Sequence, residues 1–493
     1  MNDVLEAGVI GKECKHAIYV RAQDGSKDDL IAIKETVHLE NGETRPSMNF
    51  IENYERDFYV TKHAHRTHDQ KTEWEQMNKL QRFKTTQNKM PEAVARALGN
   101  PGFKASLPIL ARSPYLYGTD VSGSVIVKNS YRERWPDCNS ESTVAVLDTE
   151  TDVIEGHEEI ISISITYKNK AVLLATKHFL RNTNTPEASF HKALDLYLGS
   201  GKKNENMGDL INARNLSVEF GLVDNAGEAV KLAIEKAHQW MPDFLAIWNM
   251  NFDVPKMMTV LERYGYNPAD VFSDPKVPPK YRYAYYREGP SNKITASGKY
   301  MTLHPAERWH TLTCPSSFYV IDAMCVYLRV RIVKGKEASY ALDYILGKDL
   351  NLGKLRFKEA EEYTGLQWHR YMQKNHPMEY LVYNLFDCIG VEMLDEKNKD
   401  LALTLTTLIE SSDYARFPSQ PRRTCDDLHF YLLKRNMVIA STSDSMEEEL
   451  DEHVWSTSDW VVTLPTHLVD DNGIALTEEL PDVKSKYRAH VLD

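Results

Sequence analysis

The sequence contains few cysteines, and none is placed where a metal site would need it. Six cysteines are scattered over 493 residues, and no two of them form a C-x-x-C pair. This spacing disfavours a zinc ribbon and is typical of a protein whose thiols stay reduced. We therefore expect a cytoplasmic location.

Long apolar runs and an excess of basic charge are also missing. No segment reaches the length of about 20 apolar residues that spans a bilayer. The N-terminus has no basic segment followed by an apolar core. The sequence thus predicts neither a membrane partner nor a secretory signal. The net charge of −12 argues against a general nucleic-acid coat, but it is compatible with an enzyme that collects carboxylates around metal ions.

A chain of 493 residues is too long for one hydrophobic core, so we expect two or three domains. Residues 1–140 are predicted to form an α+β domain. Within it, the polar stretch 69–98 is helix-like, and 115–127 is predicted to form two short strands around a turn. A cluster of turn-forming residues at 136–142 predicts a linker.

A regular α/β pattern follows this linker. Short apolar or alternating segments indicate five strands, at 144–147, 159–167, 171–176, 244–249 and 319–324. Helices are expected at 226–241, after 250 and over 376–411. The polar run 180–224 is expected to be a long insertion. Three antiparallel strands, followed by strands that alternate with helices, indicate a ribonuclease-H-like fold.

Asp148 and Glu150 lie at the end of the first of these strands. Side chains in a strand alternate between its faces, so both carboxylates project to the same side. Two carboxylates that converge at a strand end can bind hard cations such as Mg²⁺ or Mn²⁺. Alone the pattern is weak, because about two D-x-E matches are expected by chance. A solvated strand end is the alternative.

Asp253 follows the strand at 244–249 and begins a helix. A carboxylate at that position can cap free backbone N–H groups or contact a metal. Asn249 and Phe252 lie nearby, and an amide with an aromatic ring can hold a terminal nucleotide by hydrogen bonding and stacking. A simple helix cap, with Phe252 in the core, is the alternative.

Tyr383 and Asp387 are four residues apart in the expected helix 376–411 and therefore share a face. A tyrosine hydroxyl beside a metal-binding aspartate could orient an attacking water molecule. A local hydrogen bond between the two side chains is the alternative.

Phosphodiester cleavage would give the four acids a common purpose. The reaction needs a hydroxide at neutral pH and cations that neutralise the phosphate. Two metal ions about 3.5–4 Å apart, held by carboxylates, supply both. A strand, a helix start and a later helix would together deliver such a set of ligands.

This order of motifs, D-x-E, then N-x-x-F-D, then Y-x-x-x-D, resembles that of the DEDD exonucleases. Tyr383 places the resemblance in the tyrosine subgroup, because the histidine subgroup would have histidine in place of Val382. Further segments resemble the exonuclease and N-terminal domains of family B DNA polymerases, most of all the T-even-like bacteriophage type. These segments are 45–52, 115–127, 248–258, 319–324 and 339–354.

The resemblance implies 3′→5′ removal of 5′-mononucleotides from DNA, as in proofreading. The residues that would bind two divalent metal ions, Mg²⁺ or Mn²⁺, are Asp148, Glu150, Asp253 and Asp387. Tyr383 would help to position the attacking water. The residues that would hold a single-stranded or frayed 3′ end are Thr151, Asn249 and Phe252.

The resemblance also implies a division of the chain. Residues 141–405 would form a ribonuclease-H-like exonuclease domain, an α/β fold whose mixed sheet has three antiparallel and two parallel strands flanked by helices. Residues 406–455 would be a helical segment that returns to the N-terminal domain. Residues 456–493 would begin a palm domain and end at its first motif.

The polymerase signatures of the family are absent: the sequence has no SLYP-type motif, no K-x-x-x-N-S-x-Y-G and no D-T-D-S. We therefore expect no polymerase activity from this chain alone, and a second polypeptide that carries palm, fingers and thumb. A truncated product is the alternative. Two other functions stay open, a stand-alone exonuclease acting on DNA or RNA and a non-catalytic scaffold that holds DNA. A viral source would place the protein in the host-cell cytoplasm.

Overall fold

The computed structural model of the chain describes residues 8–69, 71–155, 159–201, 209–294 and 298–444. The chain divides into two compact units. The first unit comprises Met1–Arg56, Thr85–Lys89 and Val121–Lys434, and the second comprises Asp57–Lys84, Met90–Asp120 and Arg435–Asp493. These divisions do not coincide with the predicted domain boundaries at 140, 405 and 455, and they do not test them, so those boundaries stay predictions. The predicted palm segment 456–493 lies outside the described residues.

The described part of the second unit contains two small sheets and two short α-helices. One sheet has the order β6-β4-β7, and the other pairs β5 with β18. The elements are β4 (Glu55–Thr61), β5 (Trp74–Gln76), β6 (Leu80–Thr86), β7 (Leu116–Tyr117), β18 (Met437–Ile439), α1 (Met90–Ala97) and α2 (Leu107–Leu110). The helix predicted over 69–98 is wrong except at α1. The polar residues of this stretch mark the exposed side of a strand, since Arg82 and Lys84 are exposed in β6.

The N-terminal part of the first unit is an antiparallel sheet of β1 (Val9–Arg21), β2 (Asp29–Leu39) and β3 (Thr44–Glu52). Helix α3 (Gly123–Arg134) packs against β1. Of the two strands predicted in 115–127, only β7 forms, and the second is wrong. Ser122 accepts a hydrogen bond from the backbone N of Val125 and so caps a helix there.

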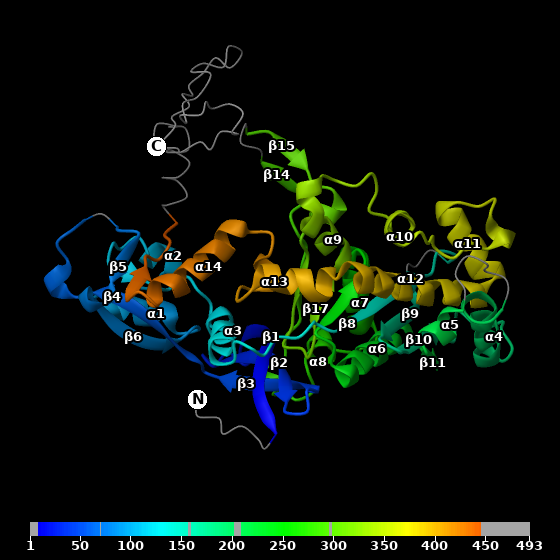
Figure 1. Cartoon of the computed structure of the whole chain (residues 1–493), viewed down its shortest axis with the longest axis horizontal. Helices are drawn as coiled ribbons and strands as arrows, with labels where there is room; N and C mark the ends of the chain where they lie inside the picture. The colour runs from blue at the N-terminus through cyan, green and yellow to red at the C-terminus, as the bar shows by residue number, and fades with distance from the viewer. Residues whose placement is uncertain (1–7, 70, 156–158, 202–208, 295–297, 445–493) are drawn as a thin grey trace, which may run out of the picture. The chain divides into compact units, whose positions relative to one another are not determined.

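The central sheet of the first unit has six strands in the order β11-β10-β9-β8-β12-β17 (Figure 1). Their bounds are β8 (Val144–Thr151), β9 (Ile160–Tyr167), β10 (Lys170–Thr176), β11 (Ser217–Val223), β12 (Phe244–Ile247) and β17 (Tyr319–Asp322). β8, β9 and β10 form an antiparallel meander, β12 lies parallel to β8, and β17 lies parallel to β12. The fold is thus mixed α/β, and all five predicted strands are confirmed.

β11 is a sixth strand inside the run expected as an insertion, and it pairs in parallel with β10. It lies at the edge of the sheet, and several of its side chains are exposed. Its sequence, SVEFGLV, has the alternating pattern of a strand at Val218, Phe220 and Leu222. This pattern is short and lies in an otherwise polar run, so the expected insertion included it.

Helices cover both faces of this sheet. α6 (Ala226–Trp240) and α7 (Met250–Arg263) pack on one face with Ala145 and Leu147 of β8. α4 (Pro186–Leu198) and α12 (Pro377–Asn398) pack on the other face with Val146. Side chains alternate along a strand, so Asp148 and Glu150 face α12, and Thr149 faces α7.

Ion pairs join the segment between β10 and α6 to α12. Arg214 follows the short helix α5 (Leu210–Ala213) and forms ion pairs with Glu392 and Glu396 of α12. Glu392 is buried and also accepts a hydrogen bond from the backbone N of Lys168 at 2.7 Å. The inserted segment is therefore part of what holds this helix in place.

Other helices and strands complete the described part of the first unit. They are α8 (Pro268–Phe272), β13 (Tyr285–Arg287), β14 (Asn292–Ile294), β15 (Tyr300–Thr302), β16 (Thr311–Thr313), α9 (Ala323–Arg331), α10 (Leu342–Leu350), α11 (Gly365–Asn375), a π turn (Asp400–Thr404), α13 (Leu405–Ile409) and α14 (Gln420–Leu433). All six cysteines are free thiols. Across the described part of the chain, no helix combines the length and the apolar character needed to cross a bilayer.

Candidate metal centre

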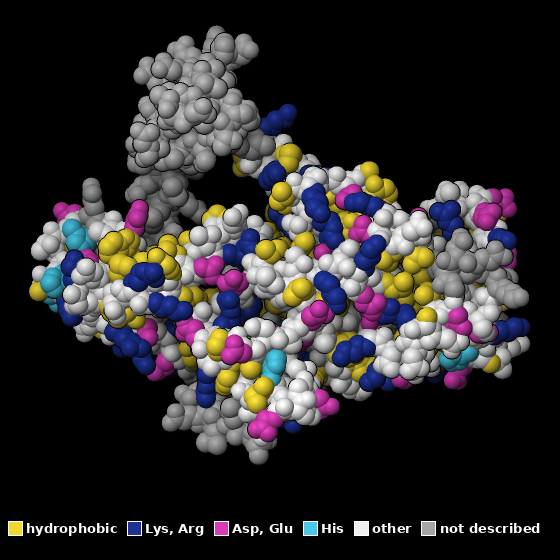
Figure 2. Space-filling model, in the orientation of Figure 1, with side chains coloured by type: hydrophobic (Ala, Val, Ile, Leu, Met, Phe, Trp, Pro, Cys, Tyr) yellow, Lys and Arg dark blue, Asp and Glu magenta, His cyan; other side chains and the backbone are white. Residues whose placement is uncertain are grey.

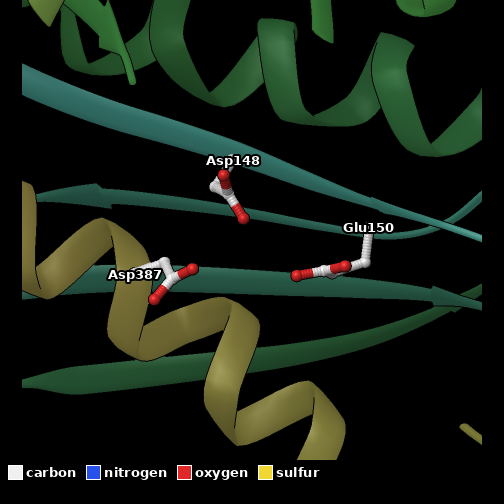
Figure 3. A group of neighbouring side chains, drawn as sticks. All are labelled: Asp148, Glu150 and Asp387. Atoms are coloured by element: carbon white, nitrogen blue, oxygen red, sulfur yellow. The ribbon is translucent and has the colours of Figure 1, made fainter. Parts of the chain in front are cut away.

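Three carboxylates meet on the α12 side of the central sheet. Oxygen atoms of Asp148, Glu150 and Asp387 all lie within 4.8 Å of one another. Figure 3 shows the three side chains pointing toward one another. Asp148 and Glu150 come from β8, and Asp387 comes from α12, which packs against β8. We call these three residues the acidic triad.

An asparagine of α12 fixes the first carboxylate of the triad. Asn384 donates a hydrogen bond from Nδ2 to Oδ2 of Asp148 at 2.6 Å. Its Oδ1 accepts hydrogen bonds from the hydroxyls of Ser162 and Ser164, at 3.2 and 2.8 Å. Because those hydroxyls occupy the carbonyl end, the NH₂ end of the amide must face Asp148.

A tyrosine of the same helix fixes the second carboxylate. The hydroxyl of Tyr380 donates a hydrogen bond to Glu150. Gln373 donates to this hydroxyl at 3.2 Å and to the carbonyl of Thr151 at 2.8 Å. It also accepts a hydrogen bond from the backbone N of Val153 at 3.1 Å. The end of β8 is thus held by side chains of α11 and α12.

Lys354 places an ammonium group beside the triad. Its Nζ contacts Oδ2 of Asp387 and donates a hydrogen bond to the hydroxyl of Tyr383 at 2.8 Å. Its charge also acts on Asp148 and Glu150. One ammonium cannot neutralise three carboxylates, so a fully ionised triad keeps an excess of negative charge.

Burial and mutual repulsion oppose ionisation of the triad. Burial, and then the charges of Asp387 and Glu150, raise the pKa of Asp148 well above its usual range. Burial also raises the pKa of Glu150 to about 8. The pKa of Asp387 is raised by burial, although the Lys354 ammonium opposes this shift. A nearby cation would favour the charged form of all three acids.

The donor set fits a hard divalent cation. The triad offers only carboxylate oxygens, the ligands that Mg²⁺ and Mn²⁺ prefer. Within the described part of the chain, Oδ1 of Asp387 is buried and accepts no hydrogen bond. A buried polar atom without a partner requires an explanation, and a bound cation would provide one. The triad could therefore hold a metal ion.

Asp253, the fourth predicted metal ligand, does not belong to this group of three. It lies in the first turn of α7 and is buried, and its Oδ1 accepts a hydrogen bond from Oγ1 of Thr149 at 2.5 Å. Thr149 faces α7 because it alternates with Asp148 along β8. Burial, and then the charge of Asp148, raise the pKa of Asp253 well above its usual range. The carboxyl group of Asp253 therefore lies outside the acidic triad, but the charge of Asp148 affects its pKa.

The three predicted contacts of a DNA end differ in accessibility. Phe252 is 46% exposed, and Nζ of Lys256 lies 3.6 Å from the centre of its ring. Asn249 precedes α7 with a φ of 70°, and its side chain makes no capping hydrogen bond. Thr151 is buried, with 6% of its surface exposed. The structure thus exposes the ring of Phe252 and encloses Thr151.

Several residues around the triad are not anticipated by the motifs. Tyr380 and Asn384 precede the predicted ligand Asp387 by seven and three residues, so helical periodicity could have placed them on the same face. Lys354 precedes Asp387 by 33 residues. Their contact depends on tertiary packing, and no local pattern indicates it.

We expect the metal-free protein to lose stability as the pH rises from about 4.5 to about 8, in part through Glu150. Its pKa of about 8 in the folded chain lies above the ordinary value of 4.5. The folded state therefore binds this proton more tightly than the unfolded state, and the stabilisation is lost as the pH rises through the folded pKa. Glu150→Gln cannot ionise and should weaken the decline. Thermal midpoints measured in EDTA across this range test the expectation.

Glu262→Gln, an exposed change on α7, is the matched control and should follow the parent. Mg²⁺ at pH 8 should raise the midpoint of the parent more than that of Glu150→Gln. Parallel pH curves and equal responses to Mg²⁺ would contradict the assignment.

No protein-family model matches the chain, and no curated protein matches it either. The function must therefore be inferred from the acidic triad and its surroundings.

Proposed function

We propose that this chain is a metal-dependent 3′→5′ exonuclease that removes nucleotides from DNA 3′ ends, as the proofreading part of a family B DNA polymerase. The observation that carries the proposal is the meeting of Asp148, Glu150 and Asp387 with Tyr383 and Lys354. These residues come from three segments that are far apart in sequence. The D-x-E pair and the Y-x-x-x-D pair thus come together in space, as the proposed chemistry requires.

The chain's own residues define what a metal would do here. The acidic triad would hold Mg²⁺ or Mn²⁺. We propose two ions with Asp253 as a further ligand, because its carboxyl group lies outside the triad but close enough to be affected by the charge of Asp148. When bound, such ions neutralise the phosphate and supply a hydroxide at neutral pH. Asn384 and Tyr380 keep Asp148 and Glu150 in place, because each donates a hydrogen bond to one of these carboxylates.

Tyr383 is suited to orient a water molecule and not to deprotonate it. Burial, and then the charge of Asp387, raise the pKa of Tyr383 well above its usual range, so the hydroxyl stays protonated at neutral pH. Lys354 donates a hydrogen bond to this hydroxyl and fixes its position. The same ammonium group lies close enough to the triad to offset negative charge on a phosphate that enters.

The surroundings of the triad support a nucleic-acid substrate. The exposed ring of Phe252 offers a surface on which a base can stack, and Lys256 adds a positive charge beside it. Figure 2 shows Lys and Arg side chains gathered over the region of α9, although the chain carries a net charge of −12. The last turn of α9 contains Arg329 and Arg331, both partly exposed, although Arg331 also forms an ion pair with Asp400. Local basic groups of this kind can contact phosphates.

The sheet supports a ribonuclease-H-like assignment. Three antiparallel strands, β10, β9 and β8, continue into the parallel strands β12 and β17, and helices cover both faces. This is the predicted order, with β11 added at one edge. The proposal that the N-terminal residues form a family B polymerase domain rests on the resemblance alone.

We further propose that a second polypeptide supplies palm, fingers and thumb, because the polymerase signatures are absent from the 493 residues. The chain alone should therefore fail to extend a primed template. A polymerase-like chain should accompany it when it is purified from its source and should restore extension. Extension by the chain alone, in preparations free of other polymerases, would overturn this part of the proposal.

Asp148→Ala combined with Glu150→Ala should leave the fold intact and abolish most nuclease activity. Two of the three triad ligands are lost, so we expect a decrease of about three orders of magnitude or more. The measurement is release of labelled mononucleotide from a 3′-labelled single strand in Mg²⁺, with EDTA abolishing the parent's activity.

Glu155→Ala, an exposed change shortly after β8, is the control and should retain the parent's rate. A double variant as fast as the parent would show that the site lies elsewhere. A folded parent without activity in either Mg²⁺ or Mn²⁺ would favour the scaffold alternative.

Tyr383→Phe should cost less than the double variant, because the acidic triad survives. Loss of one hydrogen-bonding group should lower the rate roughly 100-fold. Tyr344→Phe, on the surface of α10, is the matched control and should have no effect. If Tyr383→Phe were as damaging as the double variant while metal binding stayed normal, the hydroxyl would have a larger role than orienting water.

A further inference from the structure

A carboxylate at the end of β17 holds the start of α7. Asp322 is the last residue of β17 and is 2% exposed. Its Oδ2 accepts a hydrogen bond from the backbone N of Met250 at 2.9 Å, and its Oδ1 accepts one from the backbone N of Cys325 at 3.0 Å. One side chain thus caps two helices, α7 and α9.

Of these two hydrogen bonds, the one to Cys325 is an ordinary N-cap interaction, and the one to Met250 is not. Asp322 is the N-cap residue of α9, so its bond to Cys325 is local. α7 has its own N-cap residue, Asn249, whose side chain makes no capping hydrogen bond and whose φ of 70° is left-handed. Asp322 takes over the capping of α7, and the amide of Asn249 is not used for it.

The turn between β12 and α7 is held from both sides. β12 and β17 pair in parallel with Ile247 opposite Asp322, so the carboxylate lies next to the strand that enters the turn. Nε1 of Trp248 donates a hydrogen bond to the carbonyl of Tyr340 at 3.0 Å. Asp322 then fixes Met250 on the far side of Asn249.

We propose that Asp322 is a positioning residue for the exonuclease reaction. By accepting a hydrogen bond from the backbone N of Met250, it fixes the positions of Asn249 and Phe252 relative to the acidic triad. These positions determine where a terminal nucleotide lies when it binds. The inference rests on the proposed function. It separates positioning of the DNA end from binding of metal. Asn384 and Tyr380 hold the two carboxylates of β8 whatever happens at Asp322. Thr149 of β8 likewise holds Asp253.

Asp322→Asn isolates the bond to α7. Asparagine is as good an N-cap as aspartate, so its Oδ1 can still accept the hydrogen bond from the backbone N of Cys325. Its NH₂ group is a donor and cannot accept a hydrogen bond from the backbone N of Met250. We expect kcat/KM for a short 3′-labelled strand to fall about 10- to 100-fold, mainly through KM. The Mg²⁺ concentration that gives half-maximal activity should stay within about twofold of the parent's, because the acidic triad is untouched and Asp253 keeps its own hydrogen bond to Thr149 of β8. Asp322→Ser, which also caps α9 but is too short to reach Met250, provides a second variant if the first misfolds.

Asp395→Asn is the matched control. Asp395 is also buried in the first unit, and it accepts hydrogen bonds from the backbone N of Leu401 and Ala402, at 2.6 and 3.2 Å. Asp395→Asn should lower the thermal midpoint of unfolding, as the Asp322 variants should. It should leave kcat/KM unchanged at temperatures well below that midpoint. If the folded Asp322 variants keep the parent's kcat/KM, Asp322 is purely structural and the inference fails.

An inactive parent would count against the proposed function and would not by itself decide this inference. Binding of a labelled oligo-dT strand in Ca²⁺ then decides it. The Asp322 variants should bind about 10-fold more weakly than both the parent and Asp395→Asn. Equal binding by all four proteins would overturn the inference.

Discussion

Repulsion among enclosed carboxylates is the constraint on which the first unit depends. Asp148, Glu150 and Asp387 lie within 4.8 Å of one another, and burial raises the pKa of each. Such a group is unfavourable unless hydrogen bonds and opposite charges compensate it. Asn384 and Lys354 provide part of this compensation. The negative charge that remains when all three acids are ionised would be neutralised by a bound cation.

The alternation of β8 connects this constraint to the rest of the fold. Asp148 and Glu150 face α12, and Thr149 between them faces α7, where it binds Asp253. A single strand end therefore organises polar groups on both faces of the sheet. α12, which carries Asp387, contacts Asp148 and Glu150, and α7, which is proposed to hold a DNA end, contacts Thr149. Both helices are therefore positioned by the same three consecutive residues of β8.

The sequence predicts those parts of the fold whose signals are local. The five strands of the central sheet are found because buried strands are short apolar runs between turns. The pairs Asp148 with Glu150 and Tyr383 with Asp387 follow from the periods of a strand and of a helix. β11 is missed because its short alternating pattern lies in an otherwise polar run, and the start of α3 is mistaken for a strand because its valines also occur in strands.

Contacts between distant segments have no such signal. Lys354 meets Asp387, and Asp322 meets Met250, only after the sheet has been assembled. The position of Asp253 apart from the triad likewise depends on which face of the sheet α7 covers. The residues of the candidate site are thus predictable as a set of chemical types, while their grouping is a property of tertiary structure.

The ion pairs of Arg214 bear on any attempt to shorten this protein. Removing α5 and Arg214 from the excursion between β10 and α6 would take away the guanidinium that accompanies Glu392, a carboxylate that is only 5% exposed. A buried charge that loses its counter-ion destabilises a fold by roughly 3–5 kcal/mol. Glu392 lies in the same helix as Asp387, so that loss would fall on the helix that builds the site. A minimal version of the unit would therefore need a neutral side chain at position 392, introduced together with the deletion.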